Sequence, residues 1–181
     1  AGSTERAAAA MARLRRLAAR SGVPSNTLAR GISLLAAAPS VSFDDAMGLA
    51  PRITEISRGD PTRASRLFYG IGQVAENRFL EADEMRQLKE NMFNPSAEIA
   101  QRRGVDIGDV KGMIHDRAIV WEDLKHAIED ATNAGGRFYG LMDRQAATQL
   151  GQVRRLSAQW RELKINFGEA LAPLAGGAKG L

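Results

Sequence analysis

Residues 135–142 read Gly135-Gly136-Arg137-Phe138-Tyr139-Gly140-Leu141-Met142 and lead into an apolar seam. The seam residues recur every three or four positions, which is the heptad-like pattern of one long helix. They are Met142, Ala146, Gln149, Val153, Leu156, Trp160, Leu163, Phe167 and Leu171. Because glycine readily takes positive φ, we expect the glycine pair to turn the chain before this helix begins.

Upstream of the glycines, capping residues and helix breakers alternate, which predicts a series of short helices. No stretch shows the alternation of a strand, so the sequence predicts an all-α fold. We expect residues 1–134 to form a compact helical bundle, and residues 135–181 to supply the joint and a long helix that packs on the bundle or a partner. The boundary signals are Gly22, Ser25 or Asn26, Ser42, Asp60-Pro61, Asn94-Pro95, Gly104, Asp106 and the segment 121–132.

Two kinds of residue lie inside predicted helices, where they are costly. Pro51 should kink or divide the helix that follows Ser42. Internal glycines cost up to about 1 kcal/mol each relative to alanine, so we expect close helix contacts where they occur. These glycines are Gly31, Gly112, Gly140 and Gly151.

Composition limits the classes of protein that remain. The 181 residues can bury one sizeable core. The net charge of +4 is too small to indicate nucleic acid by itself, and the absence of cysteine excludes disulfides and thiolate metal sites. No run of about 18 apolar residues predicts a membrane span.

Several blocks of the sequence also occur in the order that is typical of one known family. The segment 135–142 resembles the glycine-rich motif that precedes a long helix in the tape measure domain of tailed-phage tape measure proteins. Residues 70–73 and 81–88, the Asn94-Pro95 block with Gly104-Val105, and Trp121-Glu122-Asp123 are similar to earlier blocks of that family. The resemblance covers about residues 15–172.

The resemblance implies a structural module of a phage tail. Tape measure proteins occupy the tail tube as several extended copies, set the tail length and are kept soluble by assembly chaperones. The implied partners are therefore other copies of the chain, tube or hub proteins, or a chaperone. The implied location is the bacterial cytoplasm during assembly and then the tail lumen. The motif residues Gly135, Gly136, Arg137, Phe138, Tyr139 and Gly140 would form the joint, and Met142, Val153, Leu156, Trp160, Leu163 and Phe167 the interface.

One alternative is a DNA-binding regulator, because residues 97–114 have the spacing of a helix-turn-helix. The second helix would present Asp106, Asp109 and Asp116, which oppose contact with phosphates. A helical adaptor for some other protein partner is a second alternative.

Residues that could support enzyme or metal chemistry are few. Glu122 and His126 have the spacing of two metal ligands on one helix face, but no second pair accompanies them, and a surface ion pair is much the commoner explanation. No nucleophile elbow, phosphate loop or dinucleotide fingerprint occurs. We therefore expect no enzyme activity, no metal and no cofactor.

Overall fold

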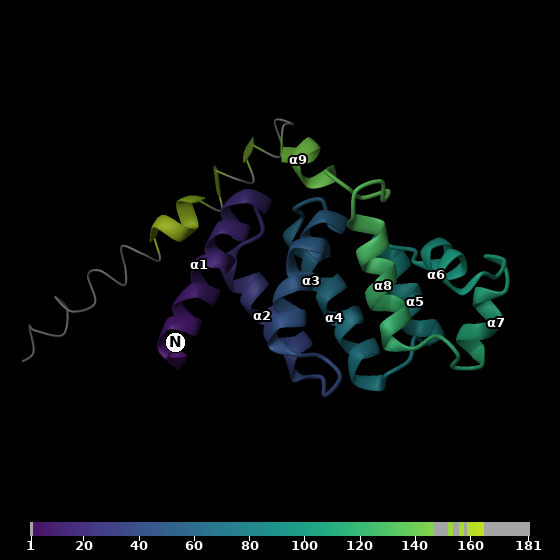
Figure 1. Ribbon diagram of the computed structural model, residues 1–181. Helices are drawn as coiled ribbons and strands as arrows, with labels where there is room; N and C mark the ends of the chain where they lie inside the picture. Colours follow the sequence, from purple (N-terminus) through teal and green to yellow (C-terminus); the bar gives the residue numbers. More distant parts are fainter. Residues whose placement is uncertain (1, 147–151, 154–155, 158, 165–181) are drawn as a thin grey trace, which may run out of the picture.

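The computed structural model describes residues 2–146, 152–153, 156–157 and 159–164, and its elements are helices (Figure 1). Within these ranges there is no strand, only an isolated β-bridge between Phe79 and Val120. The all-α prediction is thus confirmed. The helices are α1 (Ser3–Ser21), α2 (Ser25–Ala37), α3 (Phe43–Ile56), α4 (Pro61–Asn77), α5 (Ala82–Glu90), α6 (Ser96–Arg103), α7 (Val110–His115), α8 (Trp121–Thr132) and α9 (Leu141–Ala146).

Several helix ends follow the capping chemistry of the sequence. The Ser42 hydroxyl accepts a hydrogen bond from the Asp45 amide at 3.0 Å, and the Asp60 carboxylate accepts one from the Arg63 amide at 2.9 Å. Such bonds satisfy amides that have no partner inside the helix. Gly22 and Gly104, both predicted as helix boundaries, end α1 and α6 in the left-handed conformation.

Two local predictions were wrong, and a third holds at most in one of its two forms. Neither Ser25 nor Asn26 is the N-cap of α2, because the helix already begins at Ser25 and Pro24 precedes it without a side-chain cap. Of the kink or division predicted at Pro51, the division does not occur, since α3 runs unbroken from Phe43 to Ile56. The helix expected to begin at Asp106 begins only at Val110, after a turn.

The core lies where α2 packs against α3 and α4. Gly31 on α2 permits this approach, because a Cβ built there would lie 2.4 Å from the Phe68 ring of α4. The close contact predicted at Gly31 is confirmed. At Gly112 it was wrong, since a Cβ there would meet nothing within 4 Å. The largest side chains of the core include Leu28, Leu35, Ile53, Leu67, Phe68 and Ile71.

The helices α5 to α8 form the other end of the molecule, on the right of Figure 1. The bridge segment joins them: the Leu80 amide donates to the Ile119 carbonyl and the Trp121 amide donates to the Arg78 carbonyl, both at 2.9 Å. Arg103 of α6 forms a bidentate ion pair with Asp123 of α8, with a shortest distance of 2.5 Å. These contacts hold α6 and α8 together.

The C-terminal segment is described only in part. α9 is described as far as Ala146, and residues 152–153, 156–157 and 159–164 are also helical. The predicted single helix through Gln149, Gly151, Phe167 and Leu171 therefore lies partly outside the described residues. Within the described ranges, no helix combines the length and the apolar character that crossing a membrane requires.

Candidate functional site

The glycine pair forms a tight turn at the end of α8. Gly135 has φ +90°, a conformation that L side chains rarely adopt. The next residue, Gly136, donates its amide to the Asn133 carbonyl at 2.8 Å. A Cβ at Gly136 would lie 2.3 Å from the Asp130 carbonyl oxygen and 2.5 Å from that of Ala131. The two glycines are thus required for different reasons, the first for its φ angle and the second for close backbone approach.

Arg137 fixes the turn to α6 and to the segment before it. Its guanidinium donates to the Asn94 carbonyl and pairs with Glu98 at 2.8 Å. The same group lies 4.8 Å from the ring centre of Phe138 and 5.8 Å from that of Phe93. These are cation–π distances, so one side chain joins two aromatic rings and one carboxylate.

The aromatic pair of the motif divides into a buried and an exposed member. Phe138 is 5% exposed and packs edge-on against Phe93, with 6.0 Å between ring centres. Tyr139 is 55% exposed, and its carbonyl accepts a hydrogen bond from Arg144 at 2.9 Å. Phe138 therefore seals the bundle, whereas the Tyr139 ring is free for contact. Gly140, with φ +68°, reverses the chain before α9.

α9 is anchored to the N-terminal helices. Met142 is buried, and its amide lies 3.4 Å from the Glu55 carboxylate of α3. Asp143 accepts two hydrogen bonds from Arg20 of α1, at 2.7 and 3.2 Å. The hydrogen bond and charge of Asp143 raise the pKa of Arg20. No local sequence signal indicates this pair, because its members are 123 positions apart.

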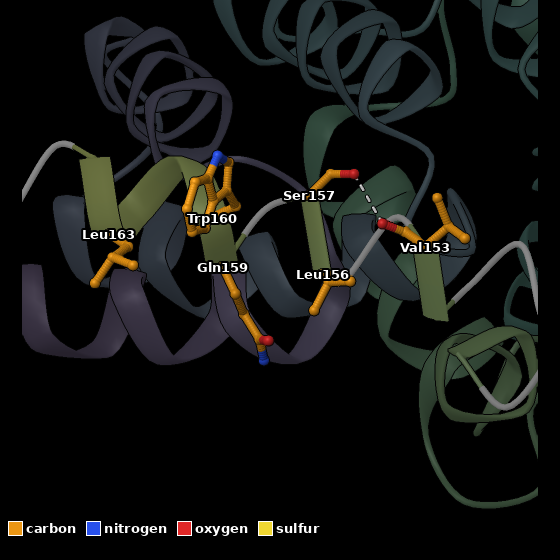
Figure 2. Close-up of a pocket in the computed structure, with 6 residues that line it drawn as sticks. All are labelled: Val153, Leu156, Ser157, Gln159, Trp160 and Leu163. Atoms are coloured by element: carbon orange, nitrogen blue, oxygen red, sulfur yellow. Dashed lines mark hydrogen bonds between the residues drawn. The ribbon is translucent and has the colours of Figure 1, made fainter.

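Beyond α9, the described seam residues are exposed. Val153 is 61% exposed, Leu156 69%, Trp160 60% and Leu163 45%. Figure 2 shows them along one segment, where the Ser157 hydroxyl donates to the Val153 carbonyl. Together with Ser157 and Gln159 they line an open hollow of about 600 Å³. Phe167, the last predicted interface residue, lies outside the described residues.

The helix-turn-helix alternative finds little support in the geometry. α7 has six residues, which gives about 9 Å of helix to place in a groove. Asp106, Asp109 and Asp116 around it are all exposed. Three solvated carboxylates at this corner oppose approach of a phosphate backbone.

The described part of the chain also contains no candidate metal site. No cluster of three or more His, Cys, Asp or Glu side chains in those residues has the arrangement of a metal site. Glu122 and His126 lie on α8 without a third ligand there.

Comparison with known proteins identifies a family. A family model described as tape measure protein matches residues 1–169. The curated proteins and the solved structures gave no significant match. The matched range includes both the bundle and the motif at residues 135–142.

Proposed function

The chain belongs to the tape measure protein family, structural proteins of phage tails, and on that premise we propose that it is a folded helical module that contributes to tail assembly and tail-length determination. In this proposal the bundle is a compact body carried on the helical ruler. Helices suit a ruler because each residue adds a fixed rise of about 1.5 Å. The module acts in the bacterial cytoplasm during assembly and then in the tail lumen.

The exposed seam carries this proposal. Each large apolar side chain that stays in water forgoes about 1.5–3 kcal/mol of burial free energy. Val153, Leu156, Trp160 and Leu163 are all about half exposed or more, whereas Met142 on the same seam is buried against the bundle. A partner helix at heptad spacing would cover them. Other copies of the chain are the partner we propose first, and the tail tube, the hub or an assembly chaperone are the others.

The glycine turn has a matching role in the proposal. We propose Gly135 and Gly136 as the joint at which the chain turns. Arg137, Phe138 and Met142 then fix the start of the C-terminal segment to the bundle. The proposed division into residues 1–134 and 135–181 follows this joint.

Analytical ultracentrifugation tests the seam. Replacing both Trp160 and Leu163 by Glu should reduce the sedimenting mass of an oligomer to that of a monomer, because two carboxylates would be buried in the contact. Both side chains are exposed in the chain itself, so circular dichroism should stay unchanged. The matched control is Gln152→Glu with Arg161→Gln, which changes the net charge equally and spares the seam. A wild-type chain that is monomeric at every concentration would refute assembly through copies.

A second experiment tests the ruler role in a phage whose tape measure protein contains this chain. Inserting about 70 heptad-patterned residues after Lys164 should lengthen the tail by about 105 Å in electron micrographs. The matched control places the same insert in the turn between Gly104 and Gly108, where it adds mass without extending the ruler. Equal tail lengths in both variants and the parent would contradict tail-length determination by this segment.

A further inference from the structure

The excess of positive charge in this chain lies in its first helix. α1 carries five arginines against one glutamate, a difference that equals the net charge of +4 of the whole chain. Positive and negative side chains therefore balance over residues 22–181. The five arginines are all exposed, and they are Arg6, Arg13, Arg15, Arg16 and Arg20. Charge gathered at one end of a molecule favours contact with a surface of the opposite sign.

Two of these arginines border an apolar hollow between α1, α2 and α3, which we call the α1 hollow. Its volume is about 280 Å³, and its lining includes Leu14, Ile32 and Met47, each at most 6% exposed. Arg13 and Arg16 also line it but are exposed, and neither has an ion-pair or hydrogen-bond partner among the described residues. Side chains three positions apart on a helix have Cβ atoms about 5–6 Å apart. The α1 hollow thus offers an apolar floor beside two neighbouring cations.

An acidic turn with an apolar tip lies just before α7, at the end of the molecule opposite α1 (Figure 1). The Asp109 amide donates to the Asp106 carbonyl at 2.9 Å, which closes a β-turn with Ile107 and Gly108 at its centre. Ile107 is 58% exposed, and both aspartates are exposed. A β-turn holds the Cα atoms of its first and last residues within about 7 Å. The acidic turn therefore presents one aliphatic side chain between two neighbouring carboxylates.

Other charged groups near the acidic turn do not reverse its sign. Lys111 and Asp116 are both exposed and offset each other. Lys89 and Glu90, which line the hollow between α5 and α7 that Ile107 borders, offset each other in the same way. The two arginines at the end of α6 are held in ion pairs by carboxylates of α8. Two carboxylates remain in excess at the turn.

The helices that line the α1 hollow carry few carboxylates. α2 has none, and Asp45 of α3 is held by Lys125 at 2.5 Å. Glu55 lies near the other end of α3, where its carboxylate is 3.4 Å from the Met142 amide. Glu5 and Asp44 are the exposed carboxylates of α1 and α3, and the α1 arginines outnumber them.

We propose that the α1 hollow of one copy receives the acidic turn of a second copy. Ile107 enters the hollow, and Asp106 and Asp109 lie opposite Arg13 and Arg16. The two surfaces match in polarity, in sign of charge and in the spacing of their charged pairs. Duplex DNA would supply phosphates but would leave the apolar floor uncovered, which favours the acidic turn as the occupant.

This contact joins different surfaces of identical chains. Because the acidic turn and α1 lie at opposite ends of the molecule, a chain cannot fill its own hollow (Figure 1). Such a head-to-tail contact adds copies in an open row unless its rotation closes a ring. The interface involves no seam residue and goes beyond the proposed function.

Sedimentation equilibrium of the full chain tests the contact. Trp160→Ser with Leu163→Ser removes the seam without changing the net charge, and both variants of this background and the parent are compared. A contact of one side chain and two ion pairs is small, so we expect a dissociation constant on the order of a millimolar. The average mass should rise past that of a dimer at about 2 mM chain, and it should fall in 1 M salt, where charges are screened beyond about 3 Å.

Charge exchange then identifies the surfaces in that background. Arg13→Glu with Arg16→Glu, and separately Asp106→Lys with Asp109→Lys, should each weaken association at least about tenfold, because like charges then face each other. A mixture of the two variants should regain the parent's association to within about threefold, since each variant then meets a surface of opposite sign. The matched control is Arg30→Glu with Arg66→Glu, which makes the same change in net charge at exposed positions outside both surfaces and should leave association intact.

The apolar tip has its own variant. Ile107→Ser should weaken association several-fold without unfolding the chain, since that side chain is more than half exposed. Circular dichroism of every variant checks the fold. Unchanged association in this variant would show that no side chain enters the hollow.

Several results would overturn the proposal. They are a monomer at every concentration, a mass that stops at a dimer, a mixture that stays dissociated, and an equal effect of the Arg30 and Arg66 changes. Because the seam is already removed from the background, a failure here is distinct from a failure of the proposed assembly through the seam.

Discussion

Replacing Gly136 by Ala should destabilise the chain through backbone contact alone. The new methyl carbon would lie 2.3 Å from the Asp130 carbonyl oxygen and 2.5 Å from that of Ala131. Real Cβ contacts are essentially never shorter than 3.0 Å, so something must move. The obstacle is the backbone at the end of α8, which cannot rotate away as a flexible side chain can. The turn must shift, and the Phe138 amide that donates to the Ala131 carbonyl at 2.9 Å must shift with it.

The magnitude follows from the cost of overpacking a rigid site. Adding one carbon where none fits costs about 1–3 kcal/mol. Alanine would gain back at most about 1 kcal/mol relative to glycine through chain entropy and helix propensity. The neighbouring change Gly135→Ala has open space around it but retains φ +90°, so we expect a loss of about 1–2 kcal/mol from conformation alone. The two losses should be similar in size but different in origin.

Urea denaturation followed by circular dichroism measures both losses. The matched control is Gly48→Ala in α3, where a Cβ meets nothing within 4 Å, and it should raise the free energy of unfolding by about 0.5–1 kcal/mol. If Gly136→Ala were as stable as the parent, with Phe138 still buried, the close approach would not constrain the turn. A continuous helix through residues 121–146 in that variant would refute the joint.

Three further predictions concern packing, acid stability and nucleic acid. Gly31→Ala should lower the free energy of unfolding by about 1–3 kcal/mol, because its methyl meets the Phe68 ring. Gly112→Ala, in open space, should raise it by up to about 1 kcal/mol. The urea concentrations at the unfolding midpoints of the two variants and the parent measure both effects. Lys125 and Ser42 lower the pKa of Asp45. Its contribution to stability is therefore present above the unfolded pKa of about 3.9 and is lost as the pH falls through the lower folded value. Asp45→Asn should reduce this acid dependence and Asp44→Asn should not, as measured by the free energy of unfolding at a series of pH values. Weak binding to duplex DNA at low salt should vanish near about 0.2 M, and a sequence-selective mobility shift at that salt would contradict it.

Local signals predicted helix ends best where a side chain supplies the cap. Ser42 and Asp60 accept the amides that their positions indicate, because capping depends only on residues within one turn. Pro51 does not divide α3, because the helix packs on α2 and α4 along its length. Tertiary packing thus outweighed one local breaker.

The family motif was visible in the sequence, but its contacts were not. The glycine pair indicated a turn, since positive φ is a local property of Gly135. That Gly136 abuts the carbonyl oxygens of Asp130 and Ala131 depends on how closely the turn folds back on the end of α8. That Arg137 reaches Glu98 depends on how α6 packs against α8.

The ion pair between Arg20 and Asp143 has a consequence for the order in which the chain is completed. Ribosomes add roughly 5–20 residues per second, so the 123 positions between the partners correspond to roughly 6–25 s of synthesis. During that interval α1 has emerged while α9, which brings Met142 to the bundle, does not yet exist. α1 can pack on α2 and α3 as soon as those helices have been made, whereas its last turn is joined to α9 only when Asp143 reaches Arg20.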